Sequence, residues 1–282
     1  MMSRFNLRKK TLIRLIPVLV ITLTMVLAAC ATVPGTGRSQ LSLVGDSELN
    51  TMAATQYKQM IQQGPLSTNQ KDTAMIKRAG ARISKAADEY LREHGLADEI
   101  PSYHWEFNLI QSDQVNAFCM PGGKVAFYTG ILPYCKDETG VAVIMGHEVA
   151  HAIAHHSRER ASQQMMTQVG GTLLSVGLGV GGASSLTSDV AMAAYGLGSE
   201  VGIILPFSRA HESEADRIGL SLMAMAGYDP GAAVGFWERM AAASGGKSGS
   251  SFLSTHPSDQ TRIADIKKHL PEAEARYKAG SK

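Results

Sequence analysis

The chain has 282 residues, of which 44% are hydrophobic and 18% charged, so it can bury one sizeable core and is not a disordered chain. Its formal charge is +2, and its Lys and Arg residues are scattered along the sequence. Because no basic cluster indicates a surface for nucleic acid, that class of partner is excluded.

The first 29 residues have the pattern of a secretory signal. Five basic residues and no acidic ones come before an apolar stretch at 15–27, which is too short to span a bilayer comfortably. The four residues that end at Cys30, Leu-Ala-Ala-Cys, resemble a bacterial lipobox. That motif implies cleavage before Cys30 and acylation of its thiol, which would attach the protein to a membrane by lipid. An N-terminal anchor that is not cleaved is the alternative.

The residue that follows Cys30 bears on the location. It is Ala31, where an Asp would resemble the signal that retains Gram-negative lipoproteins in the inner membrane. We therefore expect an outer-membrane protein that faces the periplasm. Removal of residues 1–29 would change the formal charge from +2 to −3. Residues 30–45 contain Pro and Gly and are expected to be a lipid-anchored tether, followed by one domain at 46–282.

The first half of this domain is predicted to combine two helices with a small sheet. A helix is expected at 46–63, and another at 69–94, where apolar residues recur at spacings of three and four. Alternating apolar residues and a Pro-Gly-Gly turn predict short strands at 103–111, 115–119 and 124–129.

The second half is predicted to be helical, which gives a mostly α fold with a small β-sheet. Asp137 is a suitable N-cap for a helix with an apolar stripe. Further elements are expected at 208–227 (helix), from Asp229 onward (helix), at 244–251 (flexible loop) and at 258–278 (helix). Residues 169–205 are rich in Gly, Ala, Ser and aliphatic residues, which suits a pair of closely packed helices or a mobile, membrane-touching hairpin.

The helix that Asp137 caps carries the sequence His-Glu-Val-Ala-His. His147 and His151 are four residues apart, so their imidazoles project from one face of the helix and can reach one metal ion. Glu148 lies beside them, where its carboxylate can take a proton from water whose pKa the metal lowers. A chance occurrence on a solvated helix is the alternative, but the neighbouring residues are apolar and would bury these polar side chains. The pattern therefore predicts a zinc site with one ion per chain.

A catalytic zinc site needs a third protein ligand and an open position. His155 would lie about 12 Å along the helix from the first histidine, too far to share the ion, and His156 points off the metal face. Glu212 and Asp216 are four residues apart on a later helix, so one carboxylate can bind zinc while the other orients a ligating histidine. Glu214 points elsewhere. An acidic helix start without a metal is the alternative.

With both motifs in view, the sequence resembles the gluzincin peptidases of family M48, which include CAAX prenyl proteases and peptidases of the HtpX and OMA types. HEVAH resembles the HExxH motif of that family, and ESEAD at 212–216 resembles its ExxAD motif. The resemblance covers roughly residues 45–278 and implies a zincin-like fold. It also implies the zinc ligands His147, His151 and Glu212, the general base Glu148 and the supporting acid Asp216.

Residues Asn116, Ala117 and Phe118, followed by Pro-Gly-Gly, resemble another segment of the family, upstream of the catalytic helix. In such proteins this segment is an edge strand near the cleft. An edge strand offers unpaired backbone groups to an extended peptide, so 116–118 is a candidate substrate-binding strand. An ordinary structural hairpin is the alternative.

His256 belongs to a further resemblance. Thr-His-Pro at 255–257, with Arg262, resembles a C-terminal motif of the periplasmic branch of the family, in which the His approaches the metal and closes the site. His256 is therefore a candidate fourth ligand or transition-state stabiliser, and a loop or cap residue is the alternative. For Cys119 and Cys135 the alternatives are a disulfide between them and two free thiols.

These features predict a zinc-dependent endopeptidase that hydrolyses misfolded or unassembled envelope proteins, as part of periplasmic quality control. Its partners would be polypeptide substrates and, through lipid at Cys30, a membrane. The alternative function is a chaperone or assembly factor for outer-membrane proteins with limited proteolysis. A structural lipoprotein without metal is a third possibility.

Overall fold

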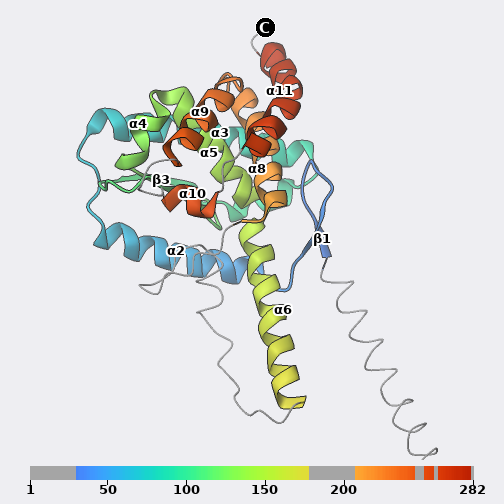
Figure 1. Cartoon of the computed structure of the whole chain (residues 1–282). Helices are drawn as coiled ribbons and strands as arrows, with labels where there is room; N and C mark the ends of the chain where they lie inside the picture. The colour runs from blue at the N-terminus through green and yellow to red at the C-terminus, as the bar shows by residue number, and fades with distance from the viewer. Residues whose placement is uncertain (1–29, 178–206, 245–250, 257–259, 281–282) are drawn as a thin grey trace, which may run out of the picture.

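The computed structural model describes residues 30–177, 207–244, 251–256 and 260–280. Within these ranges the chain is mostly helical, with one two-stranded and one three-stranded sheet (Figure 1). The predicted fold class, mostly α with a small sheet, is confirmed. The expected signal segment at 1–29 lies outside the described residues.

Helix α5 (Glu138–Ile153) lies at the centre of the fold. Its N-cap is Asp137, whose carboxylate accepts a hydrogen bond from the backbone of Gly140 at 2.9 Å. Almost every residue of α5 is buried, because α3 (Gln70–Glu93) and α8 (Arg209–Met225) both pack against it. A Cβ on Gly146 would lie 3.0 Å from the carbonyl oxygen of Gly219 on α8, so only small residues permit this close crossing. The crossing brings the polar faces of α5 and α8 together.

The C-terminal helices cover the other sides of α8 and α5. Helix α11 (Gln260–Gly280) packs on α8 and on α9 (Ala232–Ser244), and α9 packs on α5. The short helix α10 (Ser251–Thr255) is tied to the body of the protein by the backbone N–H of Phe252, which donates to the carbonyl of Val115. Phe252 and Trp237 stack in the core beside α5, so α10 holds a fixed place next to the central helix.

The three-stranded sheet has the order β3-β5-β4. Strand β3 (Glu106–Ile110) runs parallel to β5 (Lys124–Tyr128), and β4 (Ala117–Met120) is antiparallel to β5, with Ala117 opposite Phe127. Helix α2 (Asp46–Gln63) contacts β4 and β5, and the hydroxyl of Tyr57 donates to the carbonyl of Val125. The short elements η1 (Ala97–Ser102), η2 (Thr129–Ile131) and α4 (Leu132–Cys135) connect these parts.

The N-terminal segment, which was predicted to be a tether at 30–45, contains a short hairpin. Strands β1 (Cys30–Thr32) and β2 (Ser39–Leu41) form an antiparallel hairpin, and β2 packs against α6 (His156–Gly177). In Figure 1 the hairpin lies beside the body of the protein, next to the start of α6. Val33 is 1% exposed, so the hairpin contributes to the core.

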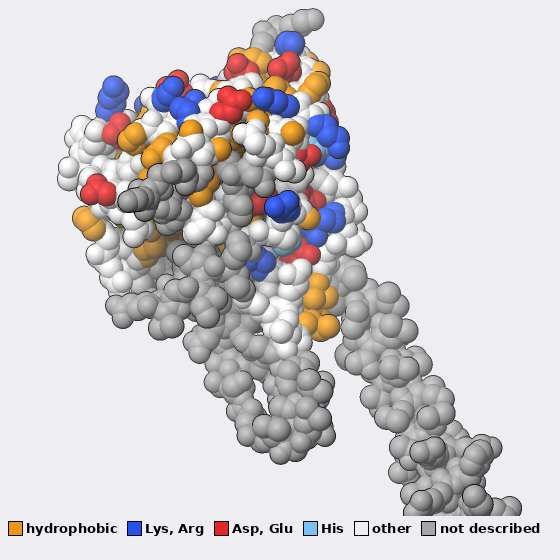
Figure 2. Space-filling view, in the orientation of Figure 1, with side chains coloured by type: hydrophobic (Ala, Val, Ile, Leu, Met, Phe, Trp, Pro, Cys, Tyr) orange, Lys and Arg blue, Asp and Glu red, His pale blue; other side chains and the backbone are white. Residues whose placement is uncertain are grey.

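Several boundaries differ from those expected. Helix α9 begins at Ala232, a little after Asp229, whose carboxylate accepts from the backbone of Gly231. Residues 169–177 continue α6, while the rest of the Gly-rich segment and the loop at 245–250 lie outside the described residues. Cys119 and Cys135 are both free thiols. Among the described helices, none combines the length and apolar character needed to cross a bilayer. On the face shown in Figure 2, charged side chains of both signs are interspersed with hydrophobic ones.

Candidate active site

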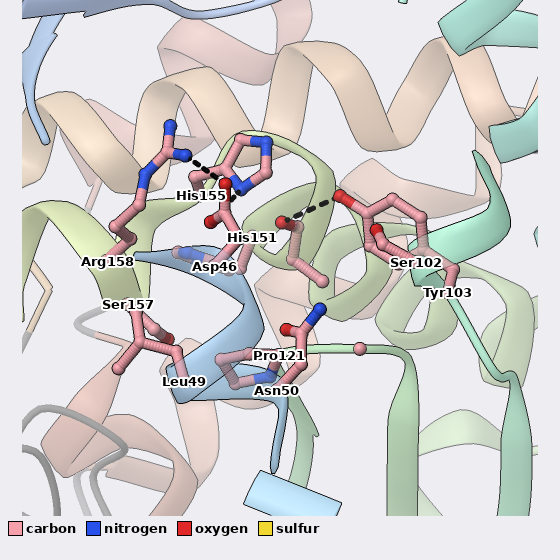
Figure 3. Close-up of a pocket in the computed structure, with 12 residues that line it drawn as sticks. Asp46, Leu49, Asn50, Ser102, Tyr103, Pro121, His151, His155, Ser157 and Arg158 are labelled. Atoms are coloured by element: carbon pink, nitrogen blue, oxygen red, sulfur yellow. Dashed lines mark hydrogen bonds and ion pairs between the residues drawn. The ribbon is translucent and has the colours of Figure 1, made fainter. Parts of the chain in front are cut away.

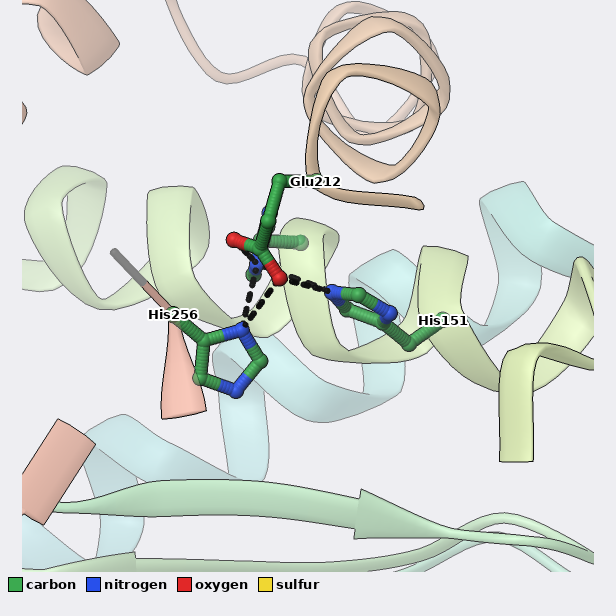
Figure 4. Close-up of side chains that lie close together, drawn as sticks. His151, Glu212 and His256 are labelled. Carbon is green, nitrogen blue, oxygen red and sulfur yellow. Dashed lines mark hydrogen bonds and ion pairs between the residues drawn. The ribbon is translucent and has the colours of Figure 1, made fainter. Parts of the chain in front are cut away.

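Four buried side chains converge between α5, α8 and α10. His147 and His151 come from α5, Glu212 from the first turn of α8, and His256 follows the last residue of α10. Each offers one ligand atom, and these atoms all lie within 4.8 Å of one another. In Figure 4 the carboxylate of Glu212 lies between the imidazoles of His151 and His256. The fold thus brings together the two sequence motifs and the candidate fourth residue.

The separations between the donor atoms suit one zinc ion. Nε2 of His147 and Nε2 of His151 are 3.0 Å apart, and Nε2 of His151 is 3.4 Å from Oε1 of Glu212. Nδ1 of His256 lies 3.2 Å from Nε2 of His147 and 2.9 Å from Oε1 of Glu212. Ligands at about 2.0–2.1 Å from a tetrahedral zinc ion are separated by about 3.3 Å, and imidazole and carboxylate are donors that zinc accepts. Donor type and spacing therefore both fit the metal.

His147 is held from behind by α8 and α11. Its Nδ1 lies 2.9 Å from Oδ1 of Asp216, which leaves Nε2 for the cluster. The guanidinium of Arg262 donates to both carboxylate oxygens of Asp216 at 2.8 Å, lies 2.7 Å from Oε2 of Glu212, and stacks on the ring of Trp237. A carboxylate behind a ligating histidine fixes its tautomer and orientation. Asp216 therefore lies where a supporting acid would act.

Burial and neighbouring charges shift the pKa values of the site residues in opposite directions. Burial by itself would raise the pKa of Glu212, but His256, Arg262 and His147 outweigh it and hold that pKa well below its usual value. Burial and Arg262 lower the pKa of His147, yet Asp216 and Glu212 outweigh them and raise it to about 9. Burial lowers the pKa of His151 well below its usual value, which Glu212 offsets only in part. Glu212 is thus an anion, as a metal ligand must be.

Glu148 lies beside the cluster and is 2% exposed. Its Oε1 is 3.5 Å from Nε2 of His256, and β4, which packs against α5, brings the backbone of Cys119 close to its carboxylate. Burial raises the pKa of Glu148, which His256 and His147 offset only in part. A raised pKa makes a carboxylate a stronger base, the property that proton abstraction from water requires.

The expected substrate-binding strand lies at the edge of its sheet. The order β3-β5-β4 leaves one side of β4 without a partner strand among the described residues. Ala117 is buried, Phe118 packs its ring near Tyr57 and Tyr128, and the side chain of Asn116 accepts from the backbone of Ala117. The side chains at 116–118 and the backbone N–H of Ala117 are therefore engaged within the protein, while β4 keeps an open edge on this side of the sheet.

His155 takes no part in the cluster. Helix α5 ends at Ile153, and His155 has a φ of 54°, so the chain turns there before α6 begins. The imidazole faces Asp46 on α2 at 3.4 Å (Figure 3) and Glu99 at 2.8 Å. His155 is excluded as a ligand, as expected, but by this turn and not by distance along a continuous helix.

A cavity of about 380 Å³ opens next to the cluster, between α8 and α11. Glu212 and Arg262 line it together with Phe207, Arg209 and Lys268. A volume in this range suits a small ligand or a peptide side chain.

The family follows from comparison with known proteins. Residues 77–270 match the family described as peptidase family M48. The chain belongs to this family. It is 40% identical to the mitochondrial metalloendopeptidase OMA1 of Schizosaccharomyces pombe over 196 residues, which cover 69% of this chain and 54% of that protein.

Two further relatives cover more of this chain. It is 30% identical over 249 residues to the mitochondrial metalloendopeptidase OMA1 of Bos taurus, covering 85% of this chain and 46% of the relative. It is 28% identical over 244 residues to the beta-barrel assembly-enhancing protease of Escherichia coli (strain K12), covering 84% and 46%. The chain thus spans about half the length of these curated relatives.

One expectation from the sequence is contradicted. An outer-membrane, periplasm-facing lipoprotein was predicted, whereas relatives at 40% and 34% identity are mitochondrial proteins. The physical reason is that a basic segment followed by an apolar run occurs in several kinds of targeting sequence, so this pattern does not fix a location. Acylation of Cys30 stays a prediction, since Cys30 begins β1 and the residues before it are not described.

Sequence reasoning missed part of the site. It noted Arg262 only as part of a motif, although the structure places its guanidinium between Glu212 and Asp216. The available signal was charge balance, since Glu148, Glu212 and Asp216 were all expected near one metal and a buried cation was needed to match them. His156 on α6, the buried partner of His151, gave no such signal.

Proposed function

We propose that this M48 protein is a zinc-dependent endopeptidase that acts on unfolded or unassembled polypeptides. The observation that carries the proposal is the buried cluster of His147, His151, Glu212 and His256, with Glu148 alongside. Membership of the M48 family supports it, and the related OMA1 proteins are named metalloendopeptidases. Because the chain spans only part of those relatives, the activity is argued from the site itself.

The residues of the chain have distinct parts in the proposed reaction. His147, His151 and Glu212 would hold the zinc ion, with Asp216 orienting His147. When bound, zinc supplies a Lewis acid that polarises water and the peptide carbonyl. Glu148 accepts the proton of the attacking water at its carboxylate and then delivers it to the amine that leaves.

His256 would control access to the site. A catalytic zinc site keeps one position open for water or substrate. Nδ1 of His256 lies among the donor atoms, 2.9 Å from Glu212, where it would take that position. His256 would therefore withdraw before a substrate enters, and His256→Ala is expected to retain zinc through the three remaining ligands.

The proposed class of substrate follows from the way β4 meets α5. Strand β4 packs against α5, and the backbone of Cys119 lies close to Glu148, so the strand lies next to the proposed general base. A peptide that pairs with β4 must be extended and must expose its backbone, which an unfolded chain does and most segments of a folded protein do not. The cavity next to Glu212 and Arg262 could take a side chain of such a peptide.

The test is Glu148→Gln, which keeps the shape of the side chain but removes its basicity. Cleavage of casein, an unfolded protein, is expected to fall about 10²–10⁴-fold while zinc content and thermal stability are retained. Glu138→Gln is the matched control, because Glu138 begins the same helix but faces Arg78 and Tyr228. Undiminished cleavage by Glu148→Gln would refute the mechanism.

A cellular test separates the alternative, an assembly or chaperone role. The related beta-barrel assembly-enhancing protease supports considering it. If cells tolerate Glu148→Gln but not deletion of the chain, the essential role is assembly. If both changes have the same effect, the role is proteolysis.

A further inference from the structure

A second buried polar cluster lies directly behind the candidate metal centre. It consists of His156 and Glu159 on α6 and His211 and Glu214 on α8, and none of the four is more than 6% exposed. Nε2 of His156 is 2.9 Å from Oε2 of Glu214, and Nε2 of His211 is 2.9 Å from Oε2 of Glu159. The two imidazoles stack with their centroids 4.5 Å apart.

This cluster touches the metal centre at one point. Nδ1 of His156 lies 2.8 Å from Nδ1 of His151, whose Nε2 faces the cluster of zinc donors. A hydrogen bond between two imidazole nitrogens needs one donor and one acceptor. With Nε2 of His151 free to ligate, its proton is on Nδ1 and is donated to His156. His156 then carries its own proton on Nε2 and donates it to Glu214, so one assignment of protons satisfies both contacts of His156.

The hairpin between β1 and β2 completes the chain of contacts. Nε of Arg38 donates to Glu214 at 2.9 Å, and its Nη1 and Nη2 donate to the two carboxylate oxygens of Glu159 at 3.0 and 2.7 Å. The hydroxyl of Thr36 also donates to Glu214. One guanidinium therefore bridges both buried carboxylates, so the positive charge that they need is already present. The M48 match begins at residue 77, after this hairpin.

We propose that His156 is a positioning residue for His151, and that Thr36 and Arg38 of the N-terminal hairpin hold it in place through Glu214. The proposal rests on the proposed function in that His151 must be a zinc ligand. Partners behind a ligating histidine fix its tautomer and raise its basicity. The N-terminal hairpin is thus part of the zinc site, although it contributes no ligand.

The test measures zinc affinity in competition with a chromophoric chelator, and thermal unfolding of the metal-free protein. His156→Phe removes the contact with His151 and is expected to weaken zinc binding about 10–100-fold. In His156→Asn the side-chain oxygen takes the place of Nδ1 and can still accept from His151, so a smaller loss is expected. Arg38→Met should weaken zinc binding. Arg38→Lys should weaken it less than Arg38→Met does, because Lys keeps the charge, although it cannot bridge both carboxylates.

The control is Arg158→Met, which breaks an ion pair between α6 and Asp46 that does not reach His151. Its zinc affinity should equal that of the wild type. The visible spectrum of the cobalt-substituted protein should change in His156→Asn and not in Arg158→Met, because only His156 touches a ligand.

Two outcomes would contradict this inference but leave the proposed function intact. One is unchanged zinc affinity in His156→Asn and Arg38→Met while Glu212→Ala loses zinc. The other is an equal loss in Arg158→Met and Arg38→Met, which would reflect general destabilisation. If wild-type protein binds no zinc, the proposed function fails and this inference fails with it. If His156→Phe does not fold, His156→Asn and the Arg38 pair decide the matter.

Discussion

The two histidines of α5 present Nε2 to the same place, yet they are supported from behind in different ways. Nδ1 of His147 meets the carboxylate of Asp216 directly, and Arg262 neutralises that carboxylate. Nδ1 of His151 meets another imidazole, and charge enters only one step later, at Glu214. The support of His147 therefore comes from packed helices, while that of His151 extends to the N-terminal hairpin.

The two motifs therefore build only one side of the site. The close crossing at Gly146 and Gly219 places Asp216 behind His147, and Arg262 of α11 completes that side. Behind His151, α5 has ended and α6 begins with His156. The turn after α5 leaves space behind His151, and α6 and the N-terminal hairpin fill this space.

The largest expected effect comes from Glu212, which faces both histidines. Glu212→Ala removes a ligand, so its zinc affinity should fall by more than the roughly 100-fold that loss of an outer hydrogen bond can cost. Metal content after dialysis, measured by atomic absorption, checks this. Arg217→Met is the matched control on the same helix, because Arg217 pairs with Glu272 at the surface, and it should keep its zinc. Equal retention by both variants would contradict the assignment of Glu212.

The next prediction concerns the stability of the protein and the residue behind His147. Arg262→Met would leave the buried carboxylates of Asp216 and Glu212 without their cation, which should destabilise the metal-free protein by about 3–5 kcal/mol. Urea unfolding in the presence of a chelator measures this. Added zinc should recover part of the loss, because the ion places positive charge next to Glu212.

Arg276→Met is the control for that experiment. Arg276 lies on the same helix and pairs with Glu93 at the surface, so less than about 1 kcal/mol should be lost. If both Arg variants lose the same stability, Arg262 has no special part in holding the site.

The sequence predicts the His147 side well because its signals are local. Asp137 and Ser208 cap their helices as their side-chain chemistry predicts, and the expected helix at 46–63 coincides with α2. Glu212 and Asp216 share one helical face, so their spacing alone places them together. Once α5 and α8 cross, both motifs must meet.

The His151 side could not be predicted because its contacts are long-range. Arg38 and Glu214 are separated by 176 positions in the sequence, and strands of three residues give too short an alternation to detect. The end of α5 was hidden too, since no Gly or Pro occurs from His147 to Val169. The left-handed backbone at His155 is favoured by tertiary bonds to Asp46 and Glu99, not by a local breaker.

Substitution of His155 is expected to have the smallest effect, because His155 supports neither His147 nor His151. Burial lowers its pKa, but hydrogen bonds to Asp46 and Glu99 outweigh burial, and the net pKa is raised. A raised pKa means that these bonds stabilise the fold fully below about pH 6.5 and lose their effect as the pH rises through the folded pKa. His155→Asn, which tolerates the positive φ, should therefore be less stable than the wild type at low pH by less than about 1 kcal/mol.

Urea unfolding of both proteins across this pH range measures the difference. The gap in free energy of unfolding should narrow as the pH rises, and zinc affinity should be the same in both. A difference in free energy of unfolding that widens with pH would mean that His155 is neutral in the folded protein. A loss of zinc affinity as large as that of His156→Asn would mean that both histidines after α5 support the site, and that the turn at His155 does not separate them.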